Sequence, residues 1–589
     1  MAAQPTPAKK LTQDEKTSLI KRLESIVGNK YTLTEPSSTE RFRKGFRFGD
    51  GPAVAVVQPG TLVEQWNILK ACEEADVIVL MQASNTGLTG GSTPDGDDYD
   101  RDIVILSTTR MDKIHLINDG KQVICFPGAT LYHLERELRP LNREPHSVIG
   151  SSCIGASVFG GVSNNSGGAL VRRGPAYTEL AVYAQRTAEG ELKLVNHLGV
   201  ELGADPEEIL TRLEKGDFTQ ADISNDAGAA SDHNYQEHVR DIDADTPARF
   251  NADPQRLHEA SGNAGKLSLF AVRLDTFEAI PSKVFYIGTN STDALSKIRR
   301  ELLSPDRELP IAGEYIHREA FDIADVYGKD TFVMIEKLGT DRLPKIFAIK
   351  GTMDAFLGRF NIHGLTDRLS QWFFHFFPDH LPKRMREYRD RFEHYLLLRV
   401  PTEQLESTRD LLANALKEYG DDQADFFECT DDEGNKAFLQ RFAAAGAAIR
   451  YRTVHHKEVE NIVALDVALR RNDKDWFEHL PPEIDNRLEK KLYYGHFLCH
   501  VMHQDYVVKK GNDCMDVEHD MWKGLDKRGA EYPAEHNVGH LYHAKPDLAN
   551  FYEKLDPCNC FNPGIGQTSK LKYWGKAPGG KKVETETEQ

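Results

Sequence analysis

The sequence predicts an α+β fold, and three observations support this class. From Ala53 onward, short apolar runs typical of buried strands alternate with longer runs whose apolar residues recur at helical spacing. Two long stretches rich in Gly, Ser and Asn interrupt this alternation. Among the 589 residues, 40% are hydrophobic and 28% are charged, which is ordinary globular usage. The composition therefore excludes a coiled coil, a collagen-like chain or a chain disordered throughout.

The elements of the N-terminal half follow from apolar periodicity and capping residues. Residues 10–27 repeat apolar side chains on one face, which predicts an amphipathic helix. Thr61 is a favoured N-cap, and it precedes a second predicted helix at 62–74. Strands are predicted at 53–57, 77–81, 103–106, 122–126 and 268–273, and a further helix at 131–138. This order is that of a βαβ-type unit with additional strands.

The charge balance argues against a nucleic-acid partner. Lys and Arg number 73 and Asp and Glu number 91, which gives a net charge of −18. Binding driven by counterion release needs a concentrated positive surface, so we expect no nucleic-acid binding. Residues 218–251 are especially acidic and are predicted to form a solvated excursion from the fold.

Cysteine use and hydropathy indicate a reducing compartment and a peripheral membrane contact at most. The eight cysteines are scattered without a C-x-x-C pair, and Cys558 and Cys560 are too close in sequence for an ordinary bridge. Residues 1–10 lack the apolar core of a secretory signal. No apolar run approaches the length of about 18 residues that a membrane span needs.

The first glycine-rich stretch directly follows the predicted strand 77–81. Residues 82–93 read QASNTGLTGGST. Small residues after a strand allow backbone N–H groups to turn toward an anionic ligand, and glycine removes the Cβ that would block a close approach. On composition alone, a ligand-binding loop and a long surface turn explain this stretch equally well.

The second glycine-rich stretch, residues 150–168, is too long for a single turn. Two such stretches separated by strands indicate a large phosphate-bearing ligand held between two subdomains. The sequence contains neither G-x-G-x-x-G nor G-x-x-x-x-G-K-[ST], which excludes a Rossmann fingerprint and a P-loop. A dinucleotide bound in another way is the interpretation that is left.

Several strings resemble known flavoenzymes. Gln58-Pro59-Gly60, residues 85–91 and residues 163–168 resemble the two-subdomain FAD-binding domain of the vanillyl-alcohol-oxidase (PCMH-type) superfamily. Residues 143–157, 315–318 and 534–540 resemble its bacterial quinone-dependent D-lactate dehydrogenases, and the resemblance covers about residues 35–575. It implies a respiratory, FAD-dependent, peripheral membrane enzyme. Such an enzyme oxidises D-lactate to pyruvate and passes the electrons to a membrane quinone.

The same resemblance implies which residues contact the FAD. They are Ala83, Ser84, Asn85, Thr86, Gly87, Gly91, Ser92, Gly150, Ser157, Gly167 and Leu269. Covalent attachment in this superfamily usually uses a His, Cys or Tyr near the flavin ring, and residues 82–93 contain none. Cys153 is the nearest candidate, and a small buried residue explains it better. The FAD is therefore expected to be noncovalent.

A histidine cluster in the C-terminal third offers groups for proton transfer or metal binding. His496, His500 and His503 share one face if their segment is a helix. The surrounding aromatic and β-branched residues favour a strand instead, in which His496 and His503 point to opposite faces. A turn or bulge between them would bring both to one ion, and periodicity leaves these cases open.

Metal-dependent relatives that oxidise D-2-hydroxy acids carry a Gly-His…His pair at this spacing and a later Glu-His pair. By this resemblance, His496, His503 and Glu535 would hold a divalent metal such as zinc. The relatives' Asp-Gly-Asn between the histidines is replaced here by Phe-Leu-Cys-His-Val-Met, and His500 has no counterpart. A metal site and a set of buried, hydrogen-bonded histidines therefore both stay open.

Oxidation of a 2-hydroxy acid by a flavin needs a base for the hydroxyl proton and a cation for the carboxylate. His536, which follows Glu535, is the predicted base because histidine titrates near neutral pH. Arginine is the expected clamp, since its planar fork matches a carboxylate. Arg441 and Arg450 flank the Ala-rich residues 442–449 and are the candidates, and a salt-bridged role explains each of them as well.

Residues 341–400 differ from the rest of this acidic chain. They carry eleven Lys and Arg against seven Asp and Glu. They also contain the aromatic run 372–377, which is followed by Lys383, Arg384 and Arg386. Aromatic residues beside basic ones suit the interface of an anionic bilayer. A core helix followed by a solvated charged face is the alternative.

These predictions define the expected organisation. An FAD-binding domain comprises residues 1–275 and 515–575, and a cap domain is inserted at 276–514, with a membrane-facing segment at 318–395 and a disordered tail at 576–589. The enzyme is expected on the cytoplasmic side of the inner membrane. Two alternatives stay open: a dehydrogenase for other D-2-hydroxy acids such as D-2-hydroxyglutarate, and a peripheral membrane or metal-binding module without a redox function.

Overall fold

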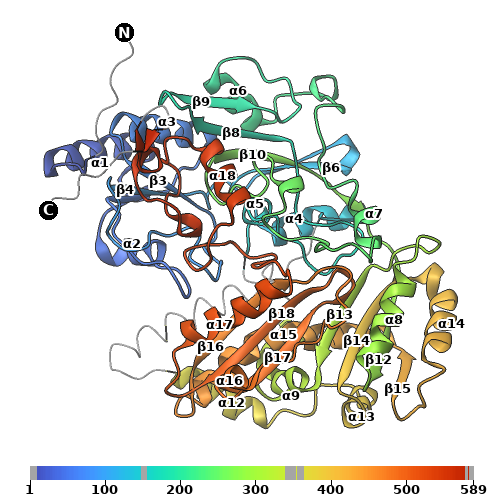
Figure 1. Ribbon diagram of the computed structural model, residues 1–589. Helices are drawn as coiled ribbons and strands as arrows, with labels where there is room; N and C mark the ends of the chain where they lie inside the picture. Colours follow the sequence, from blue (N-terminus) through green and yellow to red (C-terminus); the bar gives the residue numbers. More distant parts are fainter. Residues whose placement is uncertain (1–8, 147–154, 339–352, 354–363, 578–580, 583–589) are drawn as a thin grey trace.

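A computed structural model describes residues 9–146, 155–338, 353, 364–577, 581 and 582. Two lobes are evident in Figure 1, each built around its own β-structure. The upper lobe holds strands β1 to β10, and the lower lobe holds strands β12 to β18. Helices and sheets are mixed in both lobes, so the predicted α+β class is confirmed.

The upper lobe contains a four-stranded sheet of order β1-β2-β4-β3 and a five-stranded sheet of order β5-β6-β10-β8-β9. Strands β2, β3 and β4 are parallel, and the five-stranded sheet is antiparallel throughout. The strands are β1 Thr32–Leu33, β2 Ala55–Val57, β3 Ile78–Gln82, β4 Ile103–Ser107, β5 Ile114–Ile117, β6 Gln122–Cys125, β8 Ala181–Arg186, β9 Leu192–Asn196 and β10 Ser268–Asp275. Each strand predicted in this half is present, within a few residues of its expected limits.

Helices cover these sheets and close the core between them. Thr61 caps its helix as predicted, because its hydroxyl accepts the N–H of Glu64 at 3.1 Å. Leu23, Leu69 and Leu210 come from three different helices and pack in one buried cluster with both sheets. The helices are α1 Gln13–Val27, α3 Leu62–Glu74, α4 Leu131–Leu138, α5 Val158–Ser163 and α6 Pro206–Lys215.

The acidic stretch 218–251 is not a solvated excursion throughout, which corrects the prediction from its composition. It contains helix α7, Tyr235–Arg240, whose Tyr235 is fully buried. Arg249 is only 1% exposed. The charge of Arg249 is tolerated inside the protein because a carboxylate from the C-terminal segment, Glu535, pairs with it.

The lower lobe is built on a seven-stranded antiparallel sheet of order β15-β12-β14-β13-β17-β18-β16. One face packs against α8 Thr292–Leu302, α14 Leu405–Leu416 and α17 Cys514–Lys527. The other face packs against α9 Arg318–Tyr327, α13 Lys383–Arg391 and α15 Asp431–Val454. The strands are β12 Ser282–Thr289, β13 Ala312–His317, β14 His394–Pro401, β15 Ala424–Glu428, β16 Val459–Ala468, β17 Leu488–His496 and β18 Val501–Lys509.

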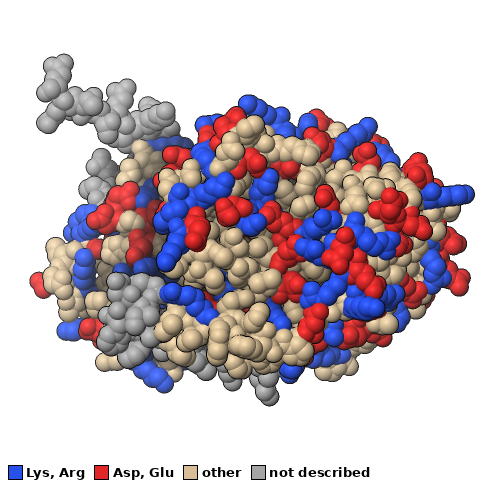
Figure 2. Space-filling model, turned by 90° about the horizontal axis from the view of Figure 1, so that it is seen from below, with Lys and Arg blue, Asp and Glu red and all other residues tan. Residues whose placement is uncertain are grey.

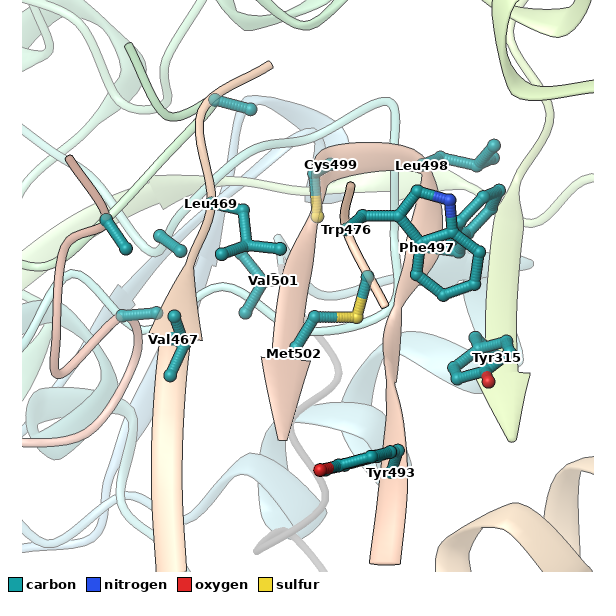
Figure 3. Packing of buried hydrophobic residues seen from close by; sticks show 14 of the residues in the cluster. Tyr315, Val467, Leu469, Trp476, Tyr493, Phe497, Leu498, Cys499, Val501 and Met502 are labelled. Atoms are coloured by element: carbon teal, nitrogen blue, oxygen red, sulfur yellow. The ribbon is translucent and has the colours of Figure 1, made fainter. Parts of the chain in front are cut away.

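Strands β17 and β18 form a hairpin whose turn is anchored by large apolar side chains. Trp476, Phe497 and Met502 belong to one buried cluster at this turn, as Figure 3 shows. Because side chains alternate along a strand, Met502 enters this cluster and its neighbour His503 points to the other face. The packing therefore fixes which way the histidines of the hairpin face.

After α17 the chain returns to the upper lobe. Helix α18, Pro546–Leu555, leads to Phe561, which makes a parallel bridge to Val79 on β3. At residues 578–580 and 583–589 the tail lies outside the described residues. Lys576–Ala577 and Lys581–Lys582 pair as the short antiparallel strands β19 and β20. In the described ranges, no helix has both the length and the apolar character needed to cross a membrane.

Gly539 is where the returning chain touches the first glycine-rich stretch. Its φ is +55°, and a Cβ there would overlap Thr89. We expect Gly539→Ala to lower the apparent melting temperature more than Gly511→Ala does. Gly511 also has a positive φ, of +86°, but no described atom lies within 4 Å of a Cβ built there. Both variants cost about 1–2 kcal/mol of backbone strain, and the overlap adds about 1–3 kcal/mol. Equal melting temperatures in scanning calorimetry would show that this contact is unimportant.

Candidate functional site

The first glycine-rich stretch presents free backbone donors beside open space. Residues 84–87 follow β3, and within the described part of the chain their N–H groups donate no hydrogen bond. A Cβ built on Gly87 would meet no described atom within 4 Å. Unpaired N–H groups facing open space are what the phosphates of a dinucleotide require. The residues of this loop therefore fit the expected FAD.

Side chains of the loop are used to hold its own shape. Asn85 has a φ of +51°, and its amide donates to the carbonyl of Lys44 at 3.1 Å. The Ser92 hydroxyl lies 3.1 Å from the Asn85 amide oxygen and donates to it. Ligand contacts from this loop would thus come mainly from the backbone, and Ala83, Thr86 and Gly87 leave that backbone uncovered.

The other expected FAD residues occupy several different environments. Side chains of the protein approach Gly91 and Gly167 closely, namely Asn537 and Arg249, so these glycines make room for the protein itself. The Ser157 hydroxyl accepts the N–H of Gly160 at 2.9 Å and caps α5. Leu269 is buried in β10. Gly150 and Cys153 lie outside the described residues.

The β17–β18 hairpin brings two of the predicted histidines together. Between the strands, Phe497–Cys499 form a single 3₁₀ turn and His500 adopts a left-handed φ of +54°. This turn places His496 Nε2 and His503 Nε2 3.2 Å apart. Of the three geometries that the sequence left open, the chain adopts the turn. His500 is 2% exposed, and its Nδ1 lies 3.2 Å from the carbonyl of Arg470, away from the pair.

Glu535 completes a compact group with these histidines. Its Oε2 lies 3.5 Å from His496 Nε2 and 3.8 Å from His503 Nε2. Ligand atoms held about 2.0–2.2 Å from one tetrahedral ion are separated by about 3.3–3.6 Å. The spacing of this trio, His496, His503 and Glu535, is therefore suitable for a single divalent ion.

Two further carboxylates, which the sequence did not predict, lie behind the histidines. Glu314 on β13 lies 2.6 Å from His496 Nδ1, and Asp466 on β16 lies 3.3 Å from His503 Nδ1. Both carboxylates are buried. A carboxylate on the far ring nitrogen is the usual outer partner of a metal-bound histidine. No short motif signals them, because each comes from a different strand.

His536 lies beside this group but is more open. Asp466 Oδ2 accepts the backbone N–H groups of Glu535 at 2.6 Å and His536 at 2.9 Å. The same oxygen lies 3.5 Å from His536 Nδ1. The His536 side chain is 39% exposed, whereas Asp466 is fully buried. Asp466 thus lies on the Nδ1 side of the His536 ring, and the ring is accessible from solvent. A base for a bound substrate needs this accessibility.

Buried charges set the protonation of the two paired histidines. Burial alone would lower the pKa of His496, but Glu314 and Glu535 outweigh it and raise the pKa to about 10. Burial lowers the pKa of His503 to about 4, and the cationic His496 adds to this effect against the pull of Asp466. One histidine is therefore charged and the other neutral at neutral pH. This arrangement lets their ring nitrogens approach without repulsion between two cations.

The two candidate arginines have different surroundings. Arg441 lies on α15 with its Nε 3.0 Å from Glu314 Oε2 and its guanidinium 4.5 Å from the ring centre of Tyr494. Arg450 lies nine residues further along the helix, where Asp330 and Asp367 bind it at 2.6 and 2.9 Å. The structure therefore brings Arg441 to the site and holds Arg450 away from it. Arg249, which pairs with Glu535, was missed because composition placed it in a solvated segment.

Both glycine-rich stretches contact the segment that carries Glu535 and His536. The Thr89 hydroxyl donates to the carbonyl of Asn537 at 2.8 Å, and the Ser166 hydroxyl donates to the carbonyl of Glu535 at 2.9 Å. Gly168 also donates its N–H to Glu535 Oε1 at 2.9 Å. The histidine and carboxylate group therefore lies where the two lobes meet, next to the expected flavin loops.

A separate apolar surface is found on α12, Leu365–His375, and the residue after it. Leu369, Trp372, Phe373 and Phe376 are 55%, 64%, 53% and 68% exposed. Figure 2 views the lower lobe from below, and acidic and basic side chains are intermixed over much of this face beside uncharged surface. We call these four residues the α12 apolar surface.

The basic residues expected at the membrane are mostly engaged by the protein. Arg384 pairs with Glu433, and Arg386 forms a bidentate pair with Asp325 at 2.9 Å. Lys383 is the most exposed of the three, with 91% of its side chain exposed, and it pairs with Glu387 of the same helix at 3.4 Å. The basic helix α13 is therefore held against the lobe by ion pairs.

Two family models match separate parts of this chain. A family model described as an FAD binding domain matches residues 53–192, and one described as D-lactate dehydrogenase, membrane binding, matches residues 284–574. The solved structure of p-cresol methylhydroxylase with bound substrate superposes with a TM-score of 0.56 at 12% identity, over 95% of this chain and 98% of that one. Fold and matched domain together define an FAD-binding oxidoreductase of this two-lobed type.

Two curated relatives show to which family of FAD-binding oxidoreductases the chain belongs. The quinone-dependent D-lactate dehydrogenase of Haemophilus influenzae is 59% identical over 95% of this chain and 99% of its own length. That of Escherichia coli is 57% identical over 96% of this chain and 99% of its own length. The chain belongs to the family of quinone-dependent D-lactate dehydrogenases.

Gly87 provides a direct test of the flavin loop. We expect Gly87→Val to fold normally, since its Cβ meets no described atom, but to be purified largely without FAD because the side chain fills the ligand's space. The measurement is the flavin-to-protein absorbance ratio. Gly524→Val is the control, because Gly524 is also surrounded by open space but lies on α17. Full flavin content in Gly87→Val would place the cofactor elsewhere.

Proposed function

We propose that this chain oxidises D-lactate to pyruvate and delivers the electrons to a membrane quinone. The observation that carries the proposal is the identity of 57–59% to two enzymes of that name over almost the whole chain. When bound, the FAD supplies the acceptor for the hydride that leaves the substrate carbon. We further propose that it is bound noncovalently, because residues 82–93 contain no His, Cys or Tyr for covalent attachment.

We assign the general base to His536. Its ring is 39% exposed at the junction of the lobes, and Asp466 lies behind its Nδ1. Oriented in this way, Nε2 is free to take the hydroxyl proton while the hydride leaves the adjacent carbon. Asp466 is buried and accepts two backbone N–H groups, so it holds the imidazole in position as the charge develops.

We assign a divalent metal, with zinc as the best-suited ion, to His496, His503 and Glu535. The support is the spacing of the three ligand atoms and the carboxylates behind both histidines. Such an ion would polarise the substrate hydroxyl as a Lewis acid. Arg441 is assigned to the substrate carboxylate, because it is the candidate arginine that shares Glu314 with His496.

We propose that the enzyme binds the cytoplasmic face of the inner membrane, with the α12 apolar surface as the lipid contact. Four large exposed apolar residues on one short helix and the residue after it are unusual on a protein surface in water. Lys383 adds a highly exposed cation, paired with Glu387 at 3.4 Å, that favours anionic lipid. The paired arginines of α13 contribute less, because protein carboxylates already neutralise them.

The reaction and its base are tested together by anaerobic stopped-flow absorbance. Wild-type enzyme should lose its flavin absorbance when mixed with D-lactate, and regain it with a quinone analogue. His536→Ala should keep its FAD but reduce it about 10²–10⁴-fold more slowly, the usual loss for a general base. His543→Ala, an exposed histidine seven residues away, should behave like wild type.

A wild-type flavin that D-lactate does not reduce would contradict the function. Rapid reduction in His536→Ala would contradict only the base.

The metal assignment is tested by metal analysis and reconstitution. His503→Gln should lose bound metal together with activity, and Glu314→Gln should weaken metal affinity by about 10–100-fold as the outer partner of His496. His380→Asn is the control, because His380 belongs to a different acidic cluster with Asp325 and Asp379. Full activity in chelated, metal-free wild-type enzyme would contradict the assignment.

The membrane contact is tested by sedimentation with lipid vesicles. Trp372→Ser with Phe376→Ser should weaken binding, because burying each large apolar side chain is worth about 1.5–3 kcal/mol. Phe46→Ser is the control, since Phe46 is 62% exposed but lies in the upper lobe. Charge reversal at Arg384 should have the smaller effect on binding. Unchanged binding of the double variant would move the contact to another surface.

A further inference from the structure

Two cysteines of the closing segment, Cys558 and Cys560, lie in a charged and buried environment that the proposed reaction does not use. Arg101 Nη1 and Arg186 Nη1 each lie 3.2 Å from Cys560 Sγ, so two guanidinium groups donate to one sulfur. Arg101 Nη2 also donates to the Asn559 carbonyl at 2.7 Å, and Arg186 Nη2 donates to the Gly190 carbonyl at 2.9 Å. Both arginines are thus fixed in place around the sulfur.

We propose that Cys560 is a peroxide-oxidised modification site, and that its oxidation loosens the attachment of the closing segment to the FAD loop. The inference goes beyond the proposed dehydrogenase reaction, because it concerns a residue outside the histidine and carboxylate group. Its substrate class is a small neutral peroxide. The first support is geometric: a sulfur between two fixed cations is stabilised as an anion, and the anion is the nucleophilic form of cysteine.

The electrostatics of the other buried cysteines show how unusual this environment is. The neighbouring Cys558 side chain, together with Arg101 and Arg186, outweighs burial and lowers the pKa of Cys560. Burial raises the pKa of Cys72 and of Cys125 to about 12. The thiolate form is therefore favoured at Cys560 relative to these two equally buried cysteines.

The chemical step is a two-electron oxidation of the sulfur. The Cys560 thiolate attacks one oxygen of hydrogen peroxide, an S–O bond forms, and the O–O bond breaks. The product is a sulfenic acid, and the other oxygen leaves as hydroxide, which takes up a proton from solvent. The oxidant is available to a flavoenzyme, because reduced flavin that meets dioxygen releases hydrogen peroxide.

Burial decides which oxidants can react. Cys560 is 2% exposed, and the side chains of Arg101 and Arg186 are 0% and 11% exposed. A peroxide scarcely larger than water is small enough to approach such a buried sulfur, whereas glutathione disulfide is too large. The larger thiolate fraction favours reaction at Cys560 over Cys72 or Cys125, and the weaker nucleophilicity of a low-pKa thiolate offsets part of this gain.

Cys560 is also joined to the flavin loop through its backbone and its neighbours. Its carbonyl accepts the N–H of Val79 at 3.0 Å, on the strand that leads into residues 82–93. Two residues later, the Asn562 amide donates to the carbonyl of Gly91 at 2.8 Å. An added oxygen in this packed site must displace at least one guanidinium and shift this segment. Oxidation should therefore weaken the retention of FAD.

The test uses wild-type holoenzyme treated with hydrogen peroxide, trapped with dimedone and analysed by peptide mass spectrometry. A dimedone adduct on Cys560 is the expected product, because it requires attack on the peroxide by the Cys560 sulfur. It should form at least roughly 10-fold faster than any product at Cys72 or Cys125. Glutathione disulfide should give no product at Cys560. Labelling requires neither D-lactate nor quinone, so its outcome is independent of the proposed reaction.

Variants test whether oxidation of Cys560 causes the release of FAD. Arg186→Gln should slow the labelling of Cys560, and Cys560→Ser should retain FAD in peroxide that releases it from wild type. Cys125→Ser is the matched control and should release FAD like wild type. A Cys560 peptide that stays unmodified while Cys514 reacts would overturn the modification site. Full FAD retention after complete oxidation of Cys560 would overturn the coupling to the flavin loop.

Discussion

The buried carboxylate of Glu535 is the interaction on which the junction of the lobes depends. One of its oxygens receives the N–H of Gly168 and the guanidinium of Arg249, and the other faces His496 and His503. The pKa of Glu535 stays well below its usual range, since Arg249 and His496 overcome the cost of burial. Removing one partner of such a buried pair leaves an uncompensated charge, which typically costs about 3–5 kcal/mol. The second glycine-rich stretch and the histidine hairpin are therefore coupled through one side chain.

Pairing of buried charges also holds for the two carboxylates that lie behind the histidines. Glu314 and Asp466 are buried, yet each has several partners. Glu314 is hydrogen-bonded to His496 and forms an ion pair with Arg441. Asp466 Oδ2 accepts two backbone N–H groups, and its Oδ1 lies 3.3 Å from His503 Nδ1. Buried charges are tolerated only when they are paired and hydrogen-bonded in this way. A site made of alternating acids and bases is rigid, which is what the proposed placement of a substrate hydroxyl and of an ion would require.

The lower lobe carries both a helix bound by ion pairs and an exposed apolar surface, which lies on a different helix. Helix α13 is rich in arginine, but Asp322, Asp325 and Glu433 bind these side chains and fix the helix to the lobe. The exposed aromatic residues then lie on α12, on a separate short helix. Basic composition in the sequence thus serves internal ion pairs, and the surface suited to lipid is the aromatic one.

The sequence alone determined five strands and three helices of the upper lobe, because periodicity and caps such as Thr61 act over a few residues. Strands β5, β8 and β9 and helix α6 of that lobe were not predicted. The sequence also predicted FAD-binding loops from their glycines, and it identified the family through strings that extend over the whole chain. It did not distinguish a strand from a turn at His496–His503, because the left-handed residue His500 reverses the chain inside a run of strand-forming residues. It could not find Glu314, Asp466 or Arg249, since these come from separate elements and meet only when the sheet and the lobes assemble. It also could not separate Arg441 from Arg450: both lie on one helix, and only the neighbours of each turn decide which arginine reaches the site.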